Sequence, residues 1–519
     1  MRILKQIYSD ILKDIFKLII IFIFLKKFKN DKKNNLVLIN NQYHEDFSWI
    51  NYIIGNILKT KGFGVKFIVC GGNNYCERMT HTIQKPNCRI CHIGNVLKLK
   101  SFNHDYILQN KKKNKNNLLK SYISIKKFFK KLVINNVNFS LDFKTSFLHY
   151  FKGMVTDNIN CSVVNKMYST LVNTVFSIKK IIKNQKPIKI VTINGKNIQT
   201  GILYNLSKKN KIDCYTWDVF QQGFNGILSK NSIAHEQHIS KKTWDIEKIK
   251  KIKKSDQKII KNYMHSQSKS LNTPYKYYDN NIINQKNKIF RYLNLDMEKK
   301  IISIFPNTDW DSSTIGLDDA YDDQYHFIHE MIKFSKNNQD YNVIIRCHPG
   351  EQKVGYHLRS TRPLNQYIKE EFKNDMHSNL KIVDGLSNIS SYALAQLSDH
   401  RIVYTSTLGL EFSYMGLKTL VAGNAYYKYK GFTCDIKTHN SLLKYFKNNY
   451  NKNLSKKEFF LLEKFIFLSK FKRLFKLDYF INHKFYPSLK EIKKMNENQL
   501  YNNIVNFILD KRSYLNLSK

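Results

Sequence analysis

A regular alternation of short apolar strands and helices in the second half of the chain constrains the fold more than any other feature. Five strands are expected there, at Lys300–Phe305, Asn342–Arg346, Leu380–Val383, Arg401–Tyr404 and Lys418–Val421, with helices near 322–336, at Ile389–Leu397 and at Leu408–Met415. Repeated βα units fold into a parallel sheet that carries helices on its faces. The sequence therefore predicts a doubly wound α/β domain over about residues 299–425.

The first half of the chain also alternates short apolar strands with helices. Expected strands are Leu36–Asn40, Val65–Cys70, Ile188–Ile193 and Ile212–Tyr215. The segment after them is dense in Lys and Ile with weak strand signals, and the last segment is basic and helix-like. We predict five regions: an N-terminal helix over 1–33, an α/β domain over 34–240, a helical linker over 241–298, a second α/β domain over 299–440 and a helical region over 441–519.

The N-terminus predicts an amphipathic helix, because apolar residues from Ile3 to Phe16 recur at helical spacing. The apolar run Leu18–Leu25 has eight residues, far fewer than the ~20 that span a bilayer. Lysines follow it, without the small-residue site at which a signal peptide is cleaved. Two interpretations stay open and are equally weighted: a helix lying on an anionic membrane surface, and a helix packed on its own domain.

The net charge of +46, from 86 Lys and Arg against 40 Asp and Glu, suggests an anionic partner. Lys, Asn and Ile are in excess together while Gly and Pro are scarce, a pattern typical of AT-rich coding. The chain also lacks zinc-finger spacing, an RNA-binding aromatic motif and a basic heptad region. We therefore expect no nucleic-acid partner, whereas anionic lipids or substrates fit the charge.

Three of the expected strands end in polar groups that suit a phosphate or a nucleotide. Ligands bind such sheets at the carboxyl ends of the strands. The candidate residues, in the order of their strands, are Asn307 and Asp311, then Arg346 and His348, then Ser406, Thr407 and Glu411. We predict that they gather around one crevice.

The chemistry expected of each residue follows from its position. Pro349 favours extended backbone at His348, so the imidazole can donate to a phosphate at a strand end, next to the cation of Arg346. Ser406 and Thr407 precede a helix and can hold an anion, and Glu411, one turn on, can accept bonds from ribose hydroxyls. Taken singly, a His-Pro turn, a helix cap and a solvated glutamate are the simpler explanations; their common placement favours a site.

With these motifs the sequence resembles the capsule polysaccharide biosynthesis proteins, glycosyltransferases of the GT-B architecture. The matching features are Arg346-x-His348-Pro349, S-T-x-G-x-E from Ser406 to Glu411, Gly416, and the run "GNAYYKYKGFT" from Gly423 to Thr433. The stretch "FPNTDWDSS" at 305–313 is similar to the opening of their donor domain. In the first half "VTINGKN" at 191–197 resembles an N-G-R segment of the family, with Lys196 where arginine is usual.

The resemblance implies two Rossmann-like domains that face a cleft, with a nucleotide-sugar in the C-terminal domain. It implies that His348, Ser406 and Thr407 contact the donor phosphate and that Glu411 binds the ribose, as in related transferases that use CMP-activated acidic sugars. A CMP-, UDP- or GDP-linked donor is compatible with these residues. No cofactor is expected for catalysis, and Asp309-x-Asp311 is not assigned to a metal.

Deprotonation of the acceptor hydroxyl requires a base. The segment "NQYHEDFSW" at 41–49 follows the first strand of the other domain and contains His44, Glu45 and Asp46. We predict that His44 or Asp46 is the base; capping of the next helix by Asp46 is an equally good explanation.

Four of the eight cysteines are clustered, namely Cys70, Cys76, Cys88 and Cys91. Without a cleaved export signal the compartment is expected to be reducing, which disfavours disulfides. Four thiolates can close a tetrahedral zinc site, so a structural zinc is predicted. The alternative is that Cys70 is a buried strand residue and the other three bind nothing.

Together these features predict a cytoplasmic glycosyltransferase, resting on the inner face of the membrane if the first helix is interfacial, that extends a surface polysaccharide or a lipid-linked glycan. One alternative is a polymerase that transfers glycerol phosphate from a CDP-activated donor. The other is a basic carbohydrate- or nucleic-acid-binding protein without catalytic activity.

Overall fold

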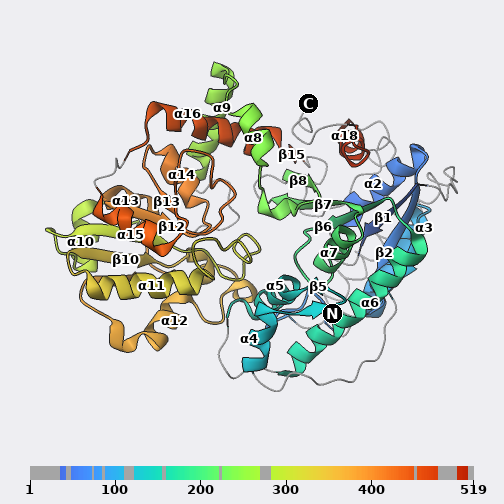
Figure 1. The fold of residues 1–519 in the computed structure, drawn as a ribbon, viewed down its shortest axis with the longest axis horizontal. Coiled ribbons are helices and arrows are strands. Elements are labelled where there is room, and N and C mark those ends of the chain that lie inside the picture. The colour runs from blue at the N-terminus through green and yellow to red at the C-terminus, as the bar shows by residue number, and fades with distance from the viewer. Residues whose placement is uncertain are drawn as a thin grey trace, which may run out of the picture. The chain divides into compact units, whose positions relative to one another are not determined.

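The computed structural model describes residues 35–41, 48–72, 75–83, 88–109, 122–154, 159, 161–220, 225–268, 282–448, 453–476 and 499–511. The chain forms two compact units (Figure 1). The first comprises residues 1–150, 157–235 and 472–519, and the second comprises residues 151–156 and 236–471. Each unit is built on its own sheet and is described by itself.

The second unit contains a six-stranded sheet, entirely parallel, in the order β11-β10-β9-β12-β13-β14. The strands are β9 (Lys300–Phe305), β10 (Tyr341–Arg346), β11 (Leu380–Val383), β12 (His400–Val403), β13 (Leu420–Val421) and β14 (Cys434–Asp435). Counted from β9, the spatial order is 3-2-1-4-5-6, the doubly wound order in which the winding reverses between the first and fourth strands. The reversal therefore falls between β9 and β12.

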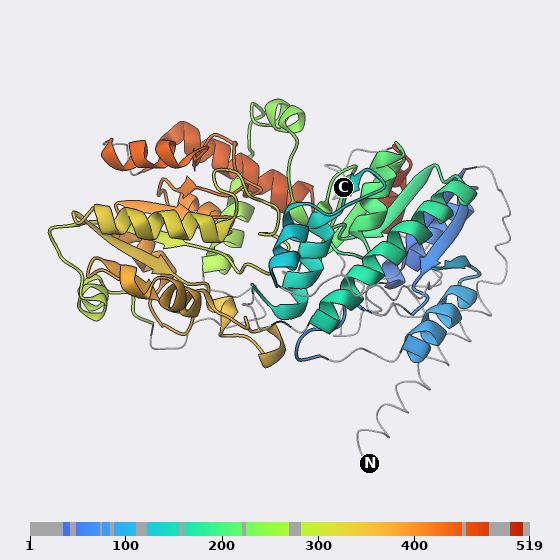
Figure 2. The same ribbon diagram turned by 60° about the horizontal axis from the view of Figure 1, so that its bottom comes forward.

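The strand sequences explain why this sheet is covered on both faces. Along β9, Ile302 and Ile304 pack into one apolar cluster and Ile301 and Phe305 into another, as expected when successive side chains point to opposite faces. One face is covered by α11 (Gln324–Asn337), α12 (Leu364–Glu371) and α15 (His439–Lys447). The other is covered by α8 (Lys241–Glu247), α9 (Lys254–Ser268), α10 (Lys286–Leu293), α13 (Ser391–Leu397), α14 (Leu408–Tyr414) and α16 (Lys456–Ile466). Figure 2 gives a second view of the ribbon.

Short helical turns connect some of these elements. They are the 3-10 helices η2 (Ala234–Glu236), η3 (Pro349–Glu351), η4 (Tyr356–Leu358) and η5 (Lys373–Asp375), and the π-helix η6 (Phe467–Lys472) after α16.

The first unit contains a seven-stranded sheet in the order β15-β8-β7-β6-β1-β2-β3. The strands are β1 (Leu36–Asn40), β2 (Gly64–Val69), β3 (Asp105–Leu108), β6 (Lys189–Ile193), β7 (Asp213–Phe220), β8 (Asn225–Lys230) and β15 (Phe475–Lys476). Five of them are parallel in the order 3-2-1-4-5, with the reversal between β1 and β6, while β8 pairs antiparallel with β7 and β15 pairs antiparallel with β8. The parallel strands of both units therefore follow the same doubly wound order.

The other elements of the first unit are mostly helices. They are α2 (Ser48–Thr60), α3 (Cys88–Ser101), α4 (Tyr122–Lys130), α5 (Ser140–Phe151), α6 (Cys161–Gln185), α7 (Gly201–Lys209) and α18 (Gln499–Ile508), and a two-strand hairpin is formed by β4 (Val133–Ile134) and β5 (Val137–Asn138). Apolar residues of α18 join those of α2 in one core cluster. The end of the chain thus returns to the first unit.

The α/β fold with parallel sheets predicted from the sequence is confirmed, and every expected strand overlaps an observed one. The sequence did not predict β3, the antiparallel β8 or the β4–β5 hairpin. The chain leaves the first unit after residue 235, near the boundary expected at 240, but the helical region expected over 441–519 is divided between the units. The helix predicted over 1–33 lies outside the described residues.

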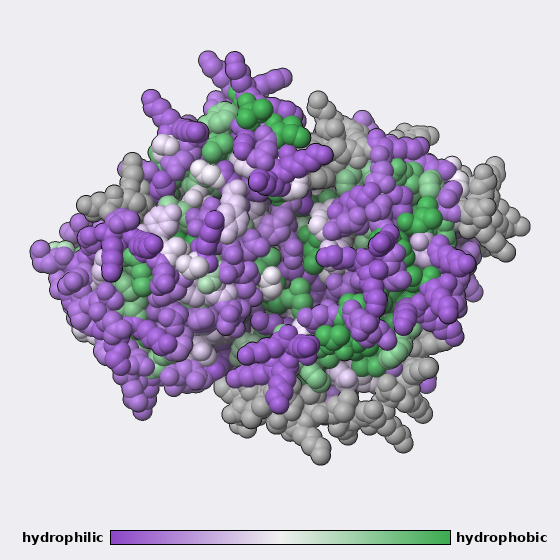
Figure 3. Space-filling view, viewed as in Figure 1, coloured by the Kyte–Doolittle hydropathy of each residue, from purple (hydrophilic) through white to green (hydrophobic). Residues whose placement is uncertain are grey.

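Within the part of the chain that the structure describes, no helix is both long and apolar enough to cross a membrane. On the face seen in Figure 3, hydrophilic side chains predominate and hydrophobic ones form small patches between them.

Candidate functional site

The polar residues that follow β9 and β12 contact one another at the reversal point of the second sheet. Phe305 and Val403 are register partners at the ends of the two strands. Beyond them, Asn307 Nδ2 donates to Thr405 Oγ1 at 3.4 Å, and the hydroxyls of Thr314 and Thr405 are 3.2 Å apart. Gln324 at the start of α11 holds Asn307, because it accepts from the Asn307 amide and donates to its carbonyl. The structure thus connects the predicted Asn307 with Thr405, which the sequence analysis did not single out, across the ends of the two strands.

His348 has the extended backbone that its proline neighbour predicts, with φ −70° and ψ 128°. Its Nδ1 accepts a hydrogen bond from the Gly350 amide at 3.0 Å, so in the neutral ring the proton is on Nε2. Burial lowers the pKa of His348 to about 4, an effect that Arg346 reinforces and Asp311 opposes. Near pH 7 the ring is therefore neutral, with Nε2–H as its donor.

The guanidinium of Arg346 is buried and donates to main-chain carbonyls. It contacts the carbonyl oxygens of Cys347 at 3.0 Å, Ser387 at 3.2 Å and Asp384. Two of these carbonyls belong to the loop after β11, so Arg346 fixes that loop to the end of β10. Its predicted contact with a phosphate remains a prediction, whereas the contacts present support a structural role.

Thr407 and Glu411 lie on one helical face, as their spacing predicts. Thr407 precedes α14 without capping it through its side chain; instead its hydroxyl and that of Tyr392 donate to the Glu411 carboxylate. Burial nevertheless raises the pKa of Glu411. Ser406 is buried, and its Oγ accepts from the Leu408 amide at 3.3 Å. The threonine and the glutamate therefore form one hydrogen-bonded group.

Glu411 lines a cavity of about 380 Å³ together with Tyr392, Tyr414 and Met415, and α9 supplies the rest of the lining, including Lys261 and His265. The cavity is predominantly apolar with a few converging polar groups, a composition common in small-molecule sites. The motifs did not point to Tyr392 or to α9, because neither carries a sequence signal of its own.

The predicted bases His44 and Asp46, with Glu45, lie outside the described residues. The ends of β1 and β6 are nevertheless connected: Asn40 Nδ2 donates at 3.0 Å both to Thr192 Oγ1 and to the Gln199 carbonyl. The loop that follows β6 contains the "NGKN" segment, in which Lys196 is completely buried.

Glu77, which the sequence analysis did not single out, lies under this loop. Its carboxylate accepts from Tyr75 OH at 3.0 Å and from Ser146 Oγ at 2.6 Å, while Ser146 Oγ accepts from the Ile198 amide at 3.0 Å. Burial raises the pKa of Glu77 to about 7 although these donors favour the ionised form. A carboxyl that titrates near neutral pH therefore supports the loop after β6.

The four clustered cysteines are all free thiols. Cys70 follows β2, and Cys88 and Cys91 lie in the first turn of α3. Burial raises the pKa of Cys76 to about 12, with Cys70 and Cys91 adding to the rise. Among the described residues, no group of three or more His, Cys, Asp or Glu side chains is arranged to hold a metal ion. This geometry lends no support to the zinc site, which stays a prediction.

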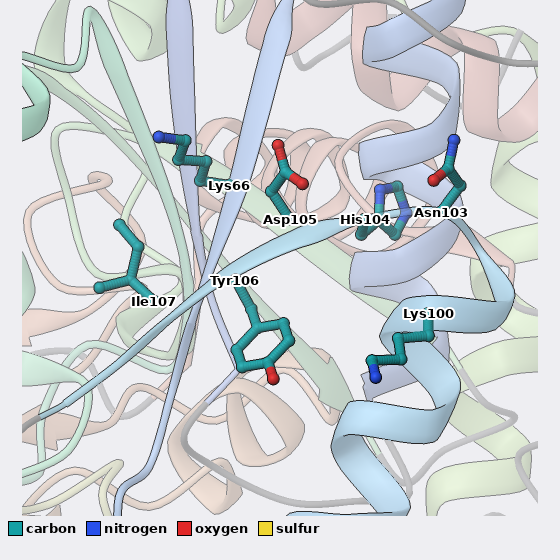
Figure 4. Close-up of a pocket in the computed structure, with 7 residues that line it drawn as sticks. All are labelled: Lys66, Lys100, Asn103, His104, Asp105, Tyr106 and Ile107. Carbon is teal, nitrogen blue, oxygen red and sulfur yellow. The ribbon is translucent and has the colours of Figure 1, made fainter.

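A second cavity, of about 570 Å³, lies in the first unit at the edge strand β3 (Figure 4). Lys66 of β2, Lys100 of α3 and residues 103–107 line it. Residues 103–105 stand at the amino end of β3, whereas ligands bind doubly wound sheets at the carboxyl ends. None of the residues predicted from the sequence lines this cavity, and we do not assign it to the site.

The sheet order defines the second unit as a doubly wound domain, and the strand-end contacts lie where such sheets bind their ligands. Residues 228–468, a little under half of the chain, match the family described as capsule polysaccharide biosynthesis protein. The match contains all the motifs of the second unit, so the resemblance that they indicate is confirmed.

Solved structures also show similarity, but only at a low level. Two are beta Kdo transferases of KpsC from Thermosulfurimonas dismutans. The 2,4 transferase is 12% identical, with a TM-score of 0.33, over 53% of this chain and 79% of that one. The 2,7 transferase is 14% identical, with a TM-score of 0.31, over 56% and 79%. A UDP-GlcNAc 2-epimerase from Neisseria meningitidis is 11% identical, with a TM-score of 0.25, over 84% and 99%. TM-scores this low carry no conclusion. Among curated proteins, no sequence matches this chain.

The raised pKa of Glu77 predicts how stability depends on pH. Because the folded state raises this pKa from 4.5 to about 7, its contribution to stability is complete below pH 4.5 and is lost as the pH rises through 7. Relative to Glu77→Gln, the natural protein should lose roughly 3 kcal/mol of unfolding free energy across this window. Urea unfolding of both proteins from pH 4.5 to 8 measures the difference. A difference that does not change with pH would contradict the assignment.

Proposed function

We propose that the protein is a glycosyltransferase that takes a sugar from a nucleotide-activated donor bound in the second unit. The observation that carries the proposal is the placement of polar groups at the carboxyl ends of β9, β10 and β12 in a 3-2-1-4-5-6 sheet, with Asn307 and Thr405 hydrogen-bonded across the reversal point. The family match over residues 228–468 supports the same class of reaction. Capsular or related surface polysaccharide is the proposed product.

The leaving group of such a transfer is the nucleotide phosphate, which gains negative charge as the glycosidic bond breaks. A donor that is fixed before the reaction stabilises this charge most effectively. His348 meets this requirement, because the Gly350 amide donates to Nδ1, which fixes the ring and leaves the proton on Nε2. Its low pKa means that the ring donates as a neutral group over the whole physiological range.

Glu411 is proposed to bind the ribose of the nucleotide. An ionised carboxylate accepts hydrogen bonds from two vicinal hydroxyls, and the hydroxyls of Thr407 and Tyr392 favour the ionised form. The adjoining cavity of about 380 Å³ offers apolar surface to a base or sugar ring. Asn307, Asp311 and Ser406 are proposed to complete the donor site, and the contacts of Arg346 favour a supporting role for it.

The remaining partners follow from the same reaction. A polysaccharide or lipid-linked glycan is proposed as the acceptor, with His44 or Asp46 as the base that deprotonates it. A cytoplasmic location against an anionic membrane face is consistent with the net charge of +46. Transfer is proposed to need no metal; Asp309 of the Asp309-x-Asp311 pair already accepts from the Met154 amide and from Tyr325 OH.

A transferase of glycerol phosphate from a CDP-activated donor is the second candidate, because it needs the same phosphate and ribose contacts. Incorporation of glycerol phosphate without sugar transfer would favour it. If His348→Ala and Glu411→Gln retained all nucleotide binding, a non-catalytic binding protein would be favoured.

Nucleotide binding gives the first test. Among CMP, CDP, UDP and GDP, at least one should raise the melting temperature, because a ligand at 100 times its Kd adds about 2.7 kcal/mol of stability. His348→Ala and Glu411→Gln should abolish most of that rise. Glu370→Gln, which changes an exposed carboxylate of α12, is the matched control and should respond like the natural protein. If no nucleotide changes the melting temperature, the donor site is wrongly assigned.

The catalytic base gives a second, independent test. Either His44→Ala or Asp46→Asn should lower kcat by about 10²- to 10⁴-fold, the usual contribution of a general base. Nucleotide binding should be unchanged in both variants, because the base belongs to the first unit. Full activity in both variants would place the base elsewhere.

A further inference from the structure

Lys152 is an unexpected member of the second unit. It follows α5 in the sequence, but residues 151–154 pack with the second unit. Thr361 fixes them there, because its Oγ1 donates to the Phe151 carbonyl at 2.6 Å and its amide donates to the Lys152 carbonyl at 3.1 Å. The Met154 amide donates to Asp309 Oδ2 at 2.8 Å. Three hydrogen bonds therefore hold this segment beside the loop that follows β9.

The backbone of the segment is unusual. Lys152 has φ +53° and Gly153 has φ +125°, and a residue other than glycine seldom adopts a positive φ. A Cβ on Gly153 would come within 3.1 Å of the Asp309 carboxylate. The chain therefore turns sharply at Lys152 and presents its side chain at one fixed place.

The side chain of Lys152 is buried, and within the described part of the chain its ammonium group has no direct polar partner. The residue is only 1% exposed, and its Nζ lies 4.3 Å from the centre of the Trp310 ring. Trp310 is itself fixed, because its Nε1 donates to Ser360 Oγ at 3.1 Å. Among the described residues, no hydrogen-bond acceptor or ion-pair partner contacts Lys152 Nζ. A buried cation is costly unless it is paired, and an aromatic ring offsets only part of that cost.

Lys152 lies at the same end of the sheet as His348. Burial lowers the pKa of Lys152 to about 8 and that of His348 to about 4. The negative charge of Asp311 opposes both decreases. Asp311 Oδ1 accepts from the Ser313 amide at 2.8 Å. Asp311 therefore helps to keep the ammonium protonated although it makes no ion-pair contact with it.

We propose that Lys152 binds an anionic oxygen of the donor's phosphate, beside the Nε2–H of His348. An oxyanion supplies what the ammonium lacks, namely negative charge and hydrogen-bond acceptors. This inference rests on the proposed function. It adds Lys152 to the donor site, although in the sequence this residue lies between α5 and α6 of the first unit. The two donors differ in kind: His348 is neutral, whereas Lys152 supplies the charge.

Titration calorimetry of four proteins tests the proposal. They are the natural protein, Lys152→Met, Lys152→Arg and the control Lys333→Met, which removes an exposed lysine of α11. The probes are CMP, CDP, UDP and GDP, the corresponding nucleosides, and inorganic phosphate. Lys152→Met should weaken binding of the preferred nucleotide at least tenfold and leave its nucleoside unaffected. Lys152→Arg should lose less, and Lys333→Met nothing.

Melting temperatures without ligand separate a binding role from a structural one. An unpaired buried ammonium lowers the stability of the protein without ligand. Lys152→Met should therefore have a melting temperature no lower than that of the natural protein. A lower melting temperature together with weaker nucleoside binding would assign Lys152 to the structure alone and overturn the proposal.

The remaining outcomes distinguish the two proposals. If Lys152→Met binds the nucleotide as tightly as the natural protein does, the Lys152 proposal is wrong and the donor site stands. If the natural protein binds inorganic phosphate through Lys152 but no nucleotide, the anion site stands and the proposed function is wrong. If it binds none of the probes, both are wrong.

Discussion

The reversal of strand order between β9 and β12 is the constraint on which the rest of the second unit depends. Parallel strands buried on both faces end together, and at the reversal the connecting segments leave toward opposite faces of the sheet. A main-chain hydrogen bond joins the Tyr404 amide to the Phe305 carbonyl at the ends of these strands, and beyond it side chains connect the two loops. Asn307 and Thr405 do so directly, while after β10 the Nδ1 atom of His348 accepts from the Gly350 amide within its own turn.

The first unit meets the same constraint between β1 and β6. Asn40 connects the two strand ends through Thr192 and the Gln199 carbonyl, and the loop after β6 rests on Ser146 and Glu77. The buried side chains of Asn40, Ser146 and Glu77 are tolerated because each has hydrogen-bond partners. In both units, side-chain hydrogen bonds thus join the strand ends at the reversal point.

Strands and strand-end residues could be predicted because both depend on local sequence. An apolar run such as Val343 to Ile345 is completely buried, and Pro349 restricts His348 wherever the chain lies. The direction of Arg346 could not be predicted, since it depends on carbonyls 38 and 41 residues away. Tyr392 and Lys152 were missed for the same reason: each meets its partner through the tertiary fold, and no spacing in the sequence indicates it. The return of α18 to α2 also joins distant segments.

A structure with bound nucleotide tests the central claim most directly. Crystals soaked with the nucleotide that stabilises the protein most should show its phosphate within hydrogen-bond distance of His348 Nε2, and its ribose hydroxyls on the Glu411 carboxylate. Both contacts at the ends of β10 and β12 would establish the second unit as the donor domain. Nucleotide density at the edge strand β3, or anywhere else away from these two side chains, would contradict the account.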